Sequence, residues 1–211
     1  MSDGERIERG SPEWLRLFVR RTNVPRRLAE LDLKDMNCPD PDYAEAIGEV
    51  ERALERLVDP GEPPTFLKLR GAIGGGKTRA AVWLLRELYA ASYPICGATC
   101  PLFLRASALV DLRFRALSPR DDDEEEDRRE VLRGRLESAS LVVLDDVARV
   151  EGFRGEEHYV ERVIETRVDL DRPTILTLNS VDGLSARFRD LLEEFESVVL
   201  APERSFRRPR R

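Results

Sequence analysis

Eight consecutive residues carry the clearest chemistry in the chain: Gly71, Ala72, Ile73, Gly74, Gly75, Gly76, Lys77 and Thr78. They fit the pattern G-x-x-x-x-G-K-[ST] in full. Glycines let backbone N–H groups turn inward around phosphate oxygens, while Lys77 supplies a cation for the β- and γ-phosphates and Thr78 a hydroxyl for Mg²⁺. An apolar stretch at 66–69 precedes the loop, and a helical pattern follows with its positive end at the anion. The segment therefore predicts binding of ATP with Mg²⁺.

Two further groups of polar residues follow apolar stretches. Asp145 and Asp146 end the buried run 141–144, and Asn179 ends the run 174–178. Ligands of open α/β sheets bind at the carboxyl ends of strands, so both groups are expected beside the loop. We expect Asp145 to hold Mg²⁺, Asp146 to orient or deprotonate the attacking water, and Asn179 to reach the γ-phosphate or that water.

The rest of the chain supplies alternating strands and helices to position these groups. Strands are expected at 66–69, 102–104, 141–144, 174–178 and 198–200, and helices at 42–58, 78–90, 106–117, 156–169 and 183–195. Seven consecutive acids at 121–127 form either a solvated loop or the start of a helix ending near Glu137. This alternation predicts a parallel α/β sheet with helices on both faces.

The N-terminal residues predict a short helical extension. Ser11 and Pro12 are typical of a helix start, and Trp14, Leu15, Phe18 and Val19 then share one face. An apolar face of this kind either covers the core or docks a partner, and core is the commoner outcome.

Composition limits the classes of protein. The 211 residues are 41% hydrophobic with a formal net charge of −6, which argues against disorder and against bulk electrostatic affinity for nucleic acid. No apolar run is long enough to span a bilayer, and the charged N-terminus does not resemble a signal peptide. The three cysteines have irregular spacing, so we expect buried thiols rather than a disulfide framework, and a cytoplasmic protein.

Four segments carry a resemblance to a known family. Residues 22–27 (TNVPRR) are similar to "G-I-P-x-R", 144–147 (LDDV) to "D-D/E-[LIV]-G", 172–179 (RPTILTLN) to "R-P-T-I-x-T-S-N" and 203–207 (ERSFR) to "G-x-S-Y-R". With the glycine-rich loop, they resemble the AAA+ ATPases of bacterial replicative helicase loaders (the DnaC and DnaI type) and of IstB-type transposition. The resemblance covers roughly residues 20–208.

The resemblance implies a P-loop AAA+ ATPase domain at 22–211 that follows an N-terminal helical extension at 1–21. The glycine-rich loop is then a Walker A motif and Asn179 is the sensor 1 residue. Arg187 matches the arginine finger that reaches a neighbouring subunit's ATP site, with Arg189 as its rival. Arg207 matches the arginine of the closing motif, near the nucleotide or a subunit boundary.

The implied function is an ATP-dependent loader or assembly factor for a nucleoprotein complex, with a replicative DNA helicase as the favoured partner. Single-stranded DNA and further copies of the chain, joined by ATP, are the other expected partners. The family's DNA-facing region falls near 106–130, where Arg113 and Arg115 are offset by the acids at 121–127. The alternatives are an IstB-like transposition ATPase and an adaptor that binds ATP but hydrolyses it little.

Overall fold

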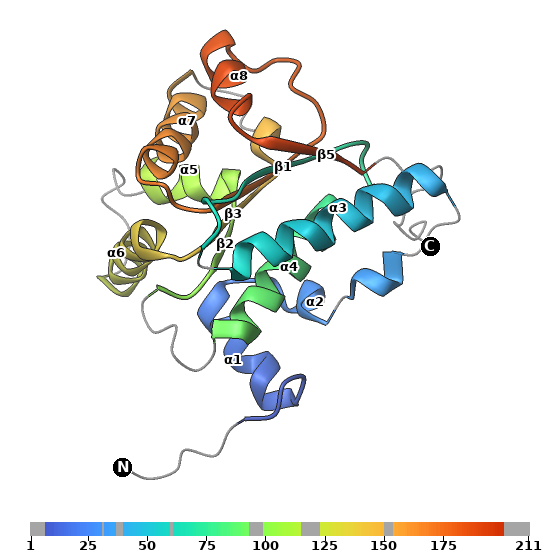
Figure 1. The fold of residues 1–211 in the computed structure, drawn as a ribbon. Helices are drawn as coiled ribbons and strands as arrows, with labels where there is room; N and C mark the ends of the chain where they lie inside the picture. The colour runs from blue at the N-terminus through green and yellow to red at the C-terminus, as the bar shows by residue number, and fades with distance from the viewer. Residues whose placement is uncertain are drawn as a thin grey trace, which may run out of the picture.

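A five-stranded parallel sheet forms the centre of the molecule (Figure 1). The computed structural model describes residues 7–30, 32–36, 40–59, 61–92, 99–114, 123–149 and 154–200. The strands are β1 Phe66–Arg70, β2 Leu102–Arg105, β3 Val142–Asp145, β4 Thr174–Leu178 and β5 Glu196–Val199. Their order in the sheet is β2-β3-β4-β1-β5, and every neighbouring pair is parallel. The predicted α/β sheet is therefore confirmed.

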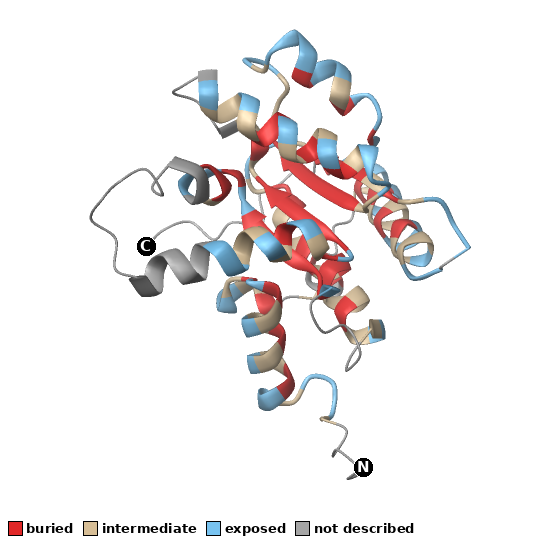
Figure 2. Ribbon diagram, turned by 90° about the vertical axis from the view of Figure 1, so that its left-hand side faces the viewer, coloured by how far each residue is buried: buried red, intermediate tan, exposed pale blue. Residues whose placement is uncertain are grey.

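Helices cover both faces of the sheet, as the sequence predicts (Figure 2). One layer contains α1 Pro12–Thr22, α2 Arg26–Ala29, the 3₁₀ turn η1 Leu33–Met36, α3 Pro41–Val58 and α4 Lys77–Ser92. The other contains α5 Ala106–Phe114, α6 Asp123–Ser138, the 3₁₀ turn η4 Val147–Arg149, α7 Arg154–Asp169 and α8 Ala186–Leu192. Side chains alternate along each strand between the two cores: Val143 and Ile175 face the α4 layer, and Leu144 and Leu176 face the α7 layer.

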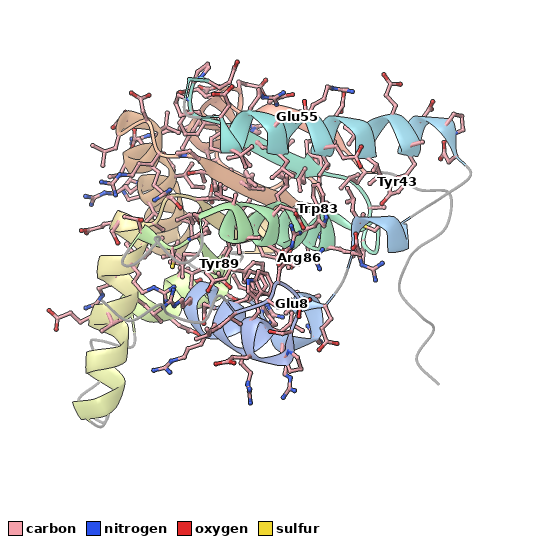
Figure 3. The ribbon with its side chains drawn as sticks, turned by 60° about the horizontal axis from the view of Figure 1, so that its bottom comes forward. Glu8, Tyr43, Glu55, Trp83, Arg86 and Tyr89 are labelled. Atoms are coloured by element: carbon pink, nitrogen blue, oxygen red, sulfur yellow. The ribbon has the colours of Figure 1, made fainter. Side chains whose placement is uncertain are left out.

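The N-terminal helix α1 packs into the core of the α4 layer. Ser11 caps it by accepting a hydrogen bond from the Trp14 N–H at 3.2 Å. Trp14 and Phe18 are 2% and 0% exposed, and both rings contact Tyr89 of α4, which Figure 3 shows on the side of α4 nearest α1. Of the two expectations for this apolar face, core cover is the one the structure shows.

A left-handed residue ends α1 and ties it to the sheet edge. Asn23 has φ 61°, and its side-chain amide donates to the Phe103 carbonyl of the edge strand β2 at 3.0 Å. The connection that follows contains α2 and η1.

Two other expectations change. Helix α8 is shorter than the predicted 183–195, because Ser185 accepts a hydrogen bond from the Phe188 N–H and so sets its start. Cys100 is buried and disulfide-bonded, which corrects the expectation of a free thiol at that position. No described helix has the combination of length and apolarity needed to cross a membrane.

A buried arginine joins the elements at the amino-terminal edge of the sheet. Arg167 of α7 is 3% exposed and donates to the carbonyls of Leu136, Ala139 and Pro173 and to the Thr174 hydroxyl. Desolvation, with a smaller contribution from the charge of Arg172, lowers the pKa of Arg167 to about 10. This edge lies opposite the polar residues singled out above, so Arg167 has a structural role.

Candidate nucleotide site

The glycine-rich loop joins β1 to α4 at the carboxyl edge of the sheet. Gly71, Gly74 and Gly76 have φ of 135°, 87° and 91°, a region that L side chains rarely adopt. A Cβ atom at Gly71 would also overlap the carbonyl oxygen of Leu200, whose N–H donates to the Arg70 carbonyl at 2.7 Å. Glycine is therefore required at 71 both by the backbone angle and by the chain that passes beside it.

Residues of the preceding segments support the loop from outside. The Tyr43 hydroxyl of α3 donates to the Gly75 carbonyl at 3.1 Å, and Tyr43 is 2% exposed. A Cβ at Gly76 would overlap the Met36 methyl group and lie 2.9 Å from the Tyr43 oxygen. The loop thus rests on η1 and α3, contacts that the sequence does not predict.

The Lys77 ammonium contacts the first two residues of this loop. Its Nζ donates to the Gly71 carbonyl at 2.7 Å and to the Ala72 carbonyl at 2.8 Å, and the residue is 7% exposed. A buried ammonium that donates to carbonyl groups at a glycine-rich turn is placed to donate to a phosphate oxygen instead. The loop and Lys77 therefore have the residue types and backbone angles expected of a phosphate-binding loop.

Thr78 and Asp145 meet beside the loop. The Thr78 hydroxyl donates to Asp145 Oδ1 at 2.7 Å, and the Asp145 residue is 7% exposed. These are hard oxygen donors, which suit Mg²⁺. Among the described residues, no group of three or more His, Cys, Asp or Glu side chains could coordinate a metal ion by itself. A magnesium ion here would take its remaining ligands from phosphate and water, as Mg²⁺ commonly does.

Asp146 and Asn179 lie at the same edge. Asp146 follows β3 with φ 63°, and its N–H donates to the Thr177 hydroxyl at 2.9 Å. Asn179 directly follows β4 and is exposed; its side chain has no hydrogen bond to a described residue. Because β4 lies between β3 and β1, the strand order brings Asn179 between the acidic pair and the glycine-rich loop.

The structure places Arg187 away from this edge. It lies near the start of α8, where its guanidinium contacts Glu161 Oε1 at 2.7 Å and the Glu165 carboxylate at 2.8 and 3.0 Å. The hydrogen bond and charge of Glu165, together with the charge of Glu161, raise the pKa of Arg187. Arg189 is exposed and makes no hydrogen bond or ion pair with a described residue. Arg207 lies outside the described residues.

Sequence reasoning gives no role to Thr177. Its hydroxyl donates to Asp145 Oδ1 at 2.7 Å and accepts from the Asp146 N–H, and the residue is 2% exposed. The available signal is its place in the segment 172–179, where Thr177 matches the second threonine of R-P-T-I-x-T-S-N, two positions before Asn179.

Comparison with known proteins places the fold. No protein-family profile and no curated protein sequence matches the chain. A structure of DnaI has a TM-score of 0.61 at 20% identity, over 85% of this chain and 95% of that one. A DnaC helicase loader has a TM-score of 0.58 at 20% identity, over 83% and 99%. A replication initiator DnaA bound to AMPPCP and single-stranded DNA has 0.57 at 20%, over 83% and 51%, so this chain spans about half the DnaA length. The chain therefore has the same fold as these DnaI and DnaC structures, a parallel sheet with helices on both faces.

Proposed function

We propose that this chain binds and hydrolyses ATP as a AAA+ loader or assembly factor for a nucleoprotein complex, with a replicative DNA helicase as the best-fitting partner. The observation that carries the nucleotide part is the meeting of three groups at the carboxyl edge of the sheet. Lys77 lies in the glycine turn, and Thr78 and Asp145 share a hydrogen bond beside it. Binding of a magnesium–triphosphate complex needs a cation, a pair of oxygen ligands for the metal, and a turn with glycine at the positions of unusual backbone angle.

Each residue has a separate task in this proposal. The loop N–H groups and Lys77 bind the β- and γ-phosphates, while Thr78 and Asp145 hold Mg²⁺, which neutralises charge on the phosphates. Asp146 orients the attacking water and accepts its proton, and Asn179 fixes the γ-phosphate or that water from the neighbouring strand. Phosphoryl transfer needs little more from a protein than this positioning and charge.

The loader role is supported by the similar structures named above, which include a helicase loader, and by the motif resemblance at 22–27, 144–147, 172–179 and 203–207. Single-stranded DNA as a second ligand is supported in the same way by the DnaA complex. Assembly of copies joined by ATP would bring an arginine of one copy to the site of the next. The proposal places the protein in the cytoplasm, where a bacterial replication complex works.

An ATP-binding adaptor is the second candidate, and one observation favours it. Arg187, the residue proposed as the finger, is held by Glu161 and Glu165 of its own chain. In this arrangement Arg187 supplies no cation to a neighbouring site, so hydrolysis would be slow unless Arg189, which is exposed on the same helix, takes its place.

Two measurements test the proposal. Titration with a fluorescent ATP analogue should show magnesium-dependent binding that Lys77→Ala abolishes, since the variant removes a cation paired with two phosphates. Asp145→Asn should weaken that binding, whereas Asp146→Asn should keep it and slow single-turnover hydrolysis. Wild-type affinity in Lys77→Ala would refute the loop assignment, and normal hydrolysis in both aspartate variants would show that the acidic pair is an ordinary turn.

The partner is tested with purified proteins. The chain should bind the replicative helicase of its own organism in the presence of ATP, and Lys77→Ala should not. Binding to a transposase instead would favour the IstB-like alternative. Helicase binding without single-turnover hydrolysis would favour the adaptor.

A further inference from the structure

We propose that Thr177 is a positioning residue that sets the orientation of both acids of the nucleotide site, Asp145 and Asp146. The inference rests on the proposed ATPase function and adds a residue to it. Thr177 lies in β4, the central strand of the sheet, between β3, which carries the acids, and β1, which leads into the glycine-rich loop. It is on the side of β4 that faces α4, the same side as Ile175.

The direction of each hydrogen bond follows from the chemistry of the groups. A hydroxyl has one hydrogen to donate and two lone pairs that accept. The Asp146 N–H can only donate, so the Thr177 oxygen accepts that bond at 2.9 Å. The hydroxyl hydrogen is then directed to Asp145 Oδ1, 2.7 Å away. One buried side chain thus acts as acceptor for the backbone of one acid and donor to the carboxylate of the other.

These bonds fix the orientation of the Asp145 carboxylate. Oδ1 accepts from Thr78 at 2.7 Å and from Thr177 at 2.7 Å, whereas Oδ2 has no hydrogen bond to a described residue. Two donors on one oxygen hold the carboxylate plane and leave the second oxygen for a ligand. Removing the Thr177 donor would free the carboxylate to rotate about its side-chain bonds.

The second bond fixes the backbone at Asp146. This residue has φ 63°, a left-handed conformation that non-glycine residues adopt rarely. Its N–H is directed into the sheet and satisfied by Thr177, so the turn after β3 is held in register with β4. The position of the Asp146 carboxylate depends on this turn. Thr177 therefore couples the residue proposed to hold Mg²⁺ to the residue proposed to orient water.

Thr174 of the same strand provides a matched control. It is 0% exposed, and its hydroxyl accepts from Arg167 Nε at 3.0 Å and donates to the Arg172 carbonyl at 2.9 Å. It lies at the other end of β4 and faces the α7 layer, as Leu176 does. Thr174→Val removes a buried hydroxyl from β4 as Thr177→Val does, but far from the acids.

The experiment compares Thr177→Val, Thr177→Ser and Thr174→Val in the full chain. Binding of a fluorescent ATP analogue is titrated with Mg²⁺ and repeated in EDTA, single-turnover hydrolysis is timed, and urea unfolding gives the stability of each variant. Loss of a residue that orients a metal ligand typically weakens metal affinity or activity by roughly 10–100-fold. We expect a shift of that size in the Mg²⁺ midpoint and in the hydrolysis rate for Thr177→Val, with nucleotide binding in EDTA unchanged. Thr177→Ser, which keeps the hydroxyl, should restore both within about threefold.

The outcomes separate this inference from the proposed function. If wild type shows no magnesium-dependent nucleotide binding, the proposed function fails and Thr177 loses its role with it. If wild type binds and hydrolyses but Thr177→Val keeps the wild-type Mg²⁺ midpoint and rate, the positioning role alone is wrong. An equal midpoint shift in Thr174→Val would also overturn it, because the effect would then be general destabilisation. Should Thr177→Val not fold, the pair Thr177→Ala and Thr177→Ser gives the same comparison of one hydroxyl.

Discussion

Trp14→Ala tests whether α1 belongs to the core of the protein. Trp14 is 2% exposed, its ring stacks on Phe18 with centroids 5.4 Å apart, and it meets Tyr89 edge-on at 5.5 Å. An aromatic side chain of this size buries about 150–250 Å². At about 25 cal/mol per Å², that area corresponds to about 4–6 kcal/mol, and measured truncations of buried Phe and Trp cost about 3–5 kcal/mol. We expect Trp14→Ala to lower the free energy of unfolding by about 3–5 kcal/mol.

Urea unfolding followed by far-UV circular dichroism measures this loss without relying on Trp14 fluorescence. With a slope of about 2–3 kcal/mol per molar urea, the midpoint should fall by about 1–2.5 M. Arg16→Ala is the control, because Arg16 lies on the exposed side of the same helix, and its effect should stay within about 0.5 kcal/mol. A midpoint shift under about 0.3 M for Trp14→Ala would refute the core assignment.

Deletion of residues 1–21 extends the same test to the whole helix. The deletion removes Trp14 and Phe18 and exposes Tyr89, which is 0% exposed in the intact chain. Loss of cooperative unfolding is the expected result. A truncated chain that stays folded and binds ATP but no longer binds its partner would instead favour docking by this segment.

Three further substitutions test other contacts. Gly76→Ala should weaken nucleotide binding and lower the free energy of unfolding by about 1–3 kcal/mol, because Gly76 has a φ of 91° and an added Cβ would overlap Met36. Gly134→Ala is the control, since a Cβ there meets nothing within 4 Å, and it should change neither quantity. Equal nucleotide affinity of the two variants would contradict this prediction. Arg187→Ala should keep ATP affinity, lose hydrolysis by on the order of 10³-fold, and regain part of it when mixed with Lys77→Ala, which still donates its own arginine. Arg189→Ala is measured in parallel, and normal hydrolysis by Arg187→Ala would exclude Arg187 as the finger. Arg167→Leu should destabilise the fold by about 1–3 kcal/mol for each of the Leu136 and Ala139 carbonyls that loses its donor, since the Pro173 carbonyl still accepts from the Val142 N–H. An unfolding midpoint equal to wild type would refute that role.

Much of the architecture was predictable because it depends on local pattern. Strands β1, β3 and β4 are short, largely apolar runs between turn residues. The loop between β1 and α4 has glycine at the positions that adopt positive φ angles. The strand predicted at 102–104 is confirmed as the edge strand β2. Parallel strands joined by helices must align their carboxyl ends, and for that reason the sequence predicts Asp145, Asp146 and Asn179 at one edge of the sheet.

The tertiary structure alone decided which side chains meet. Thr177 matches a threonine of the segment R-P-T-I-x-T-S-N, but only the pairing of β3 with β4 shows that its hydroxyl reaches Asp145 and Asp146. Helical periodicity predicts that Trp14 and Phe18 share one face, but it does not predict that Tyr89, some seventy residues later in the chain, packs against both rings. The partners of Arg187 could not be predicted either, because a guanidinium pairs with whichever carboxylates lie nearby in the folded chain. Here α8 packs on α7, and this brings Glu161 and Glu165 beside Arg187. Local sequence fixes backbone shape through dihedral angles and periodicity, whereas the partners of a polar side chain depend on residues far away in the chain, which only the folded arrangement brings within hydrogen-bonding distance.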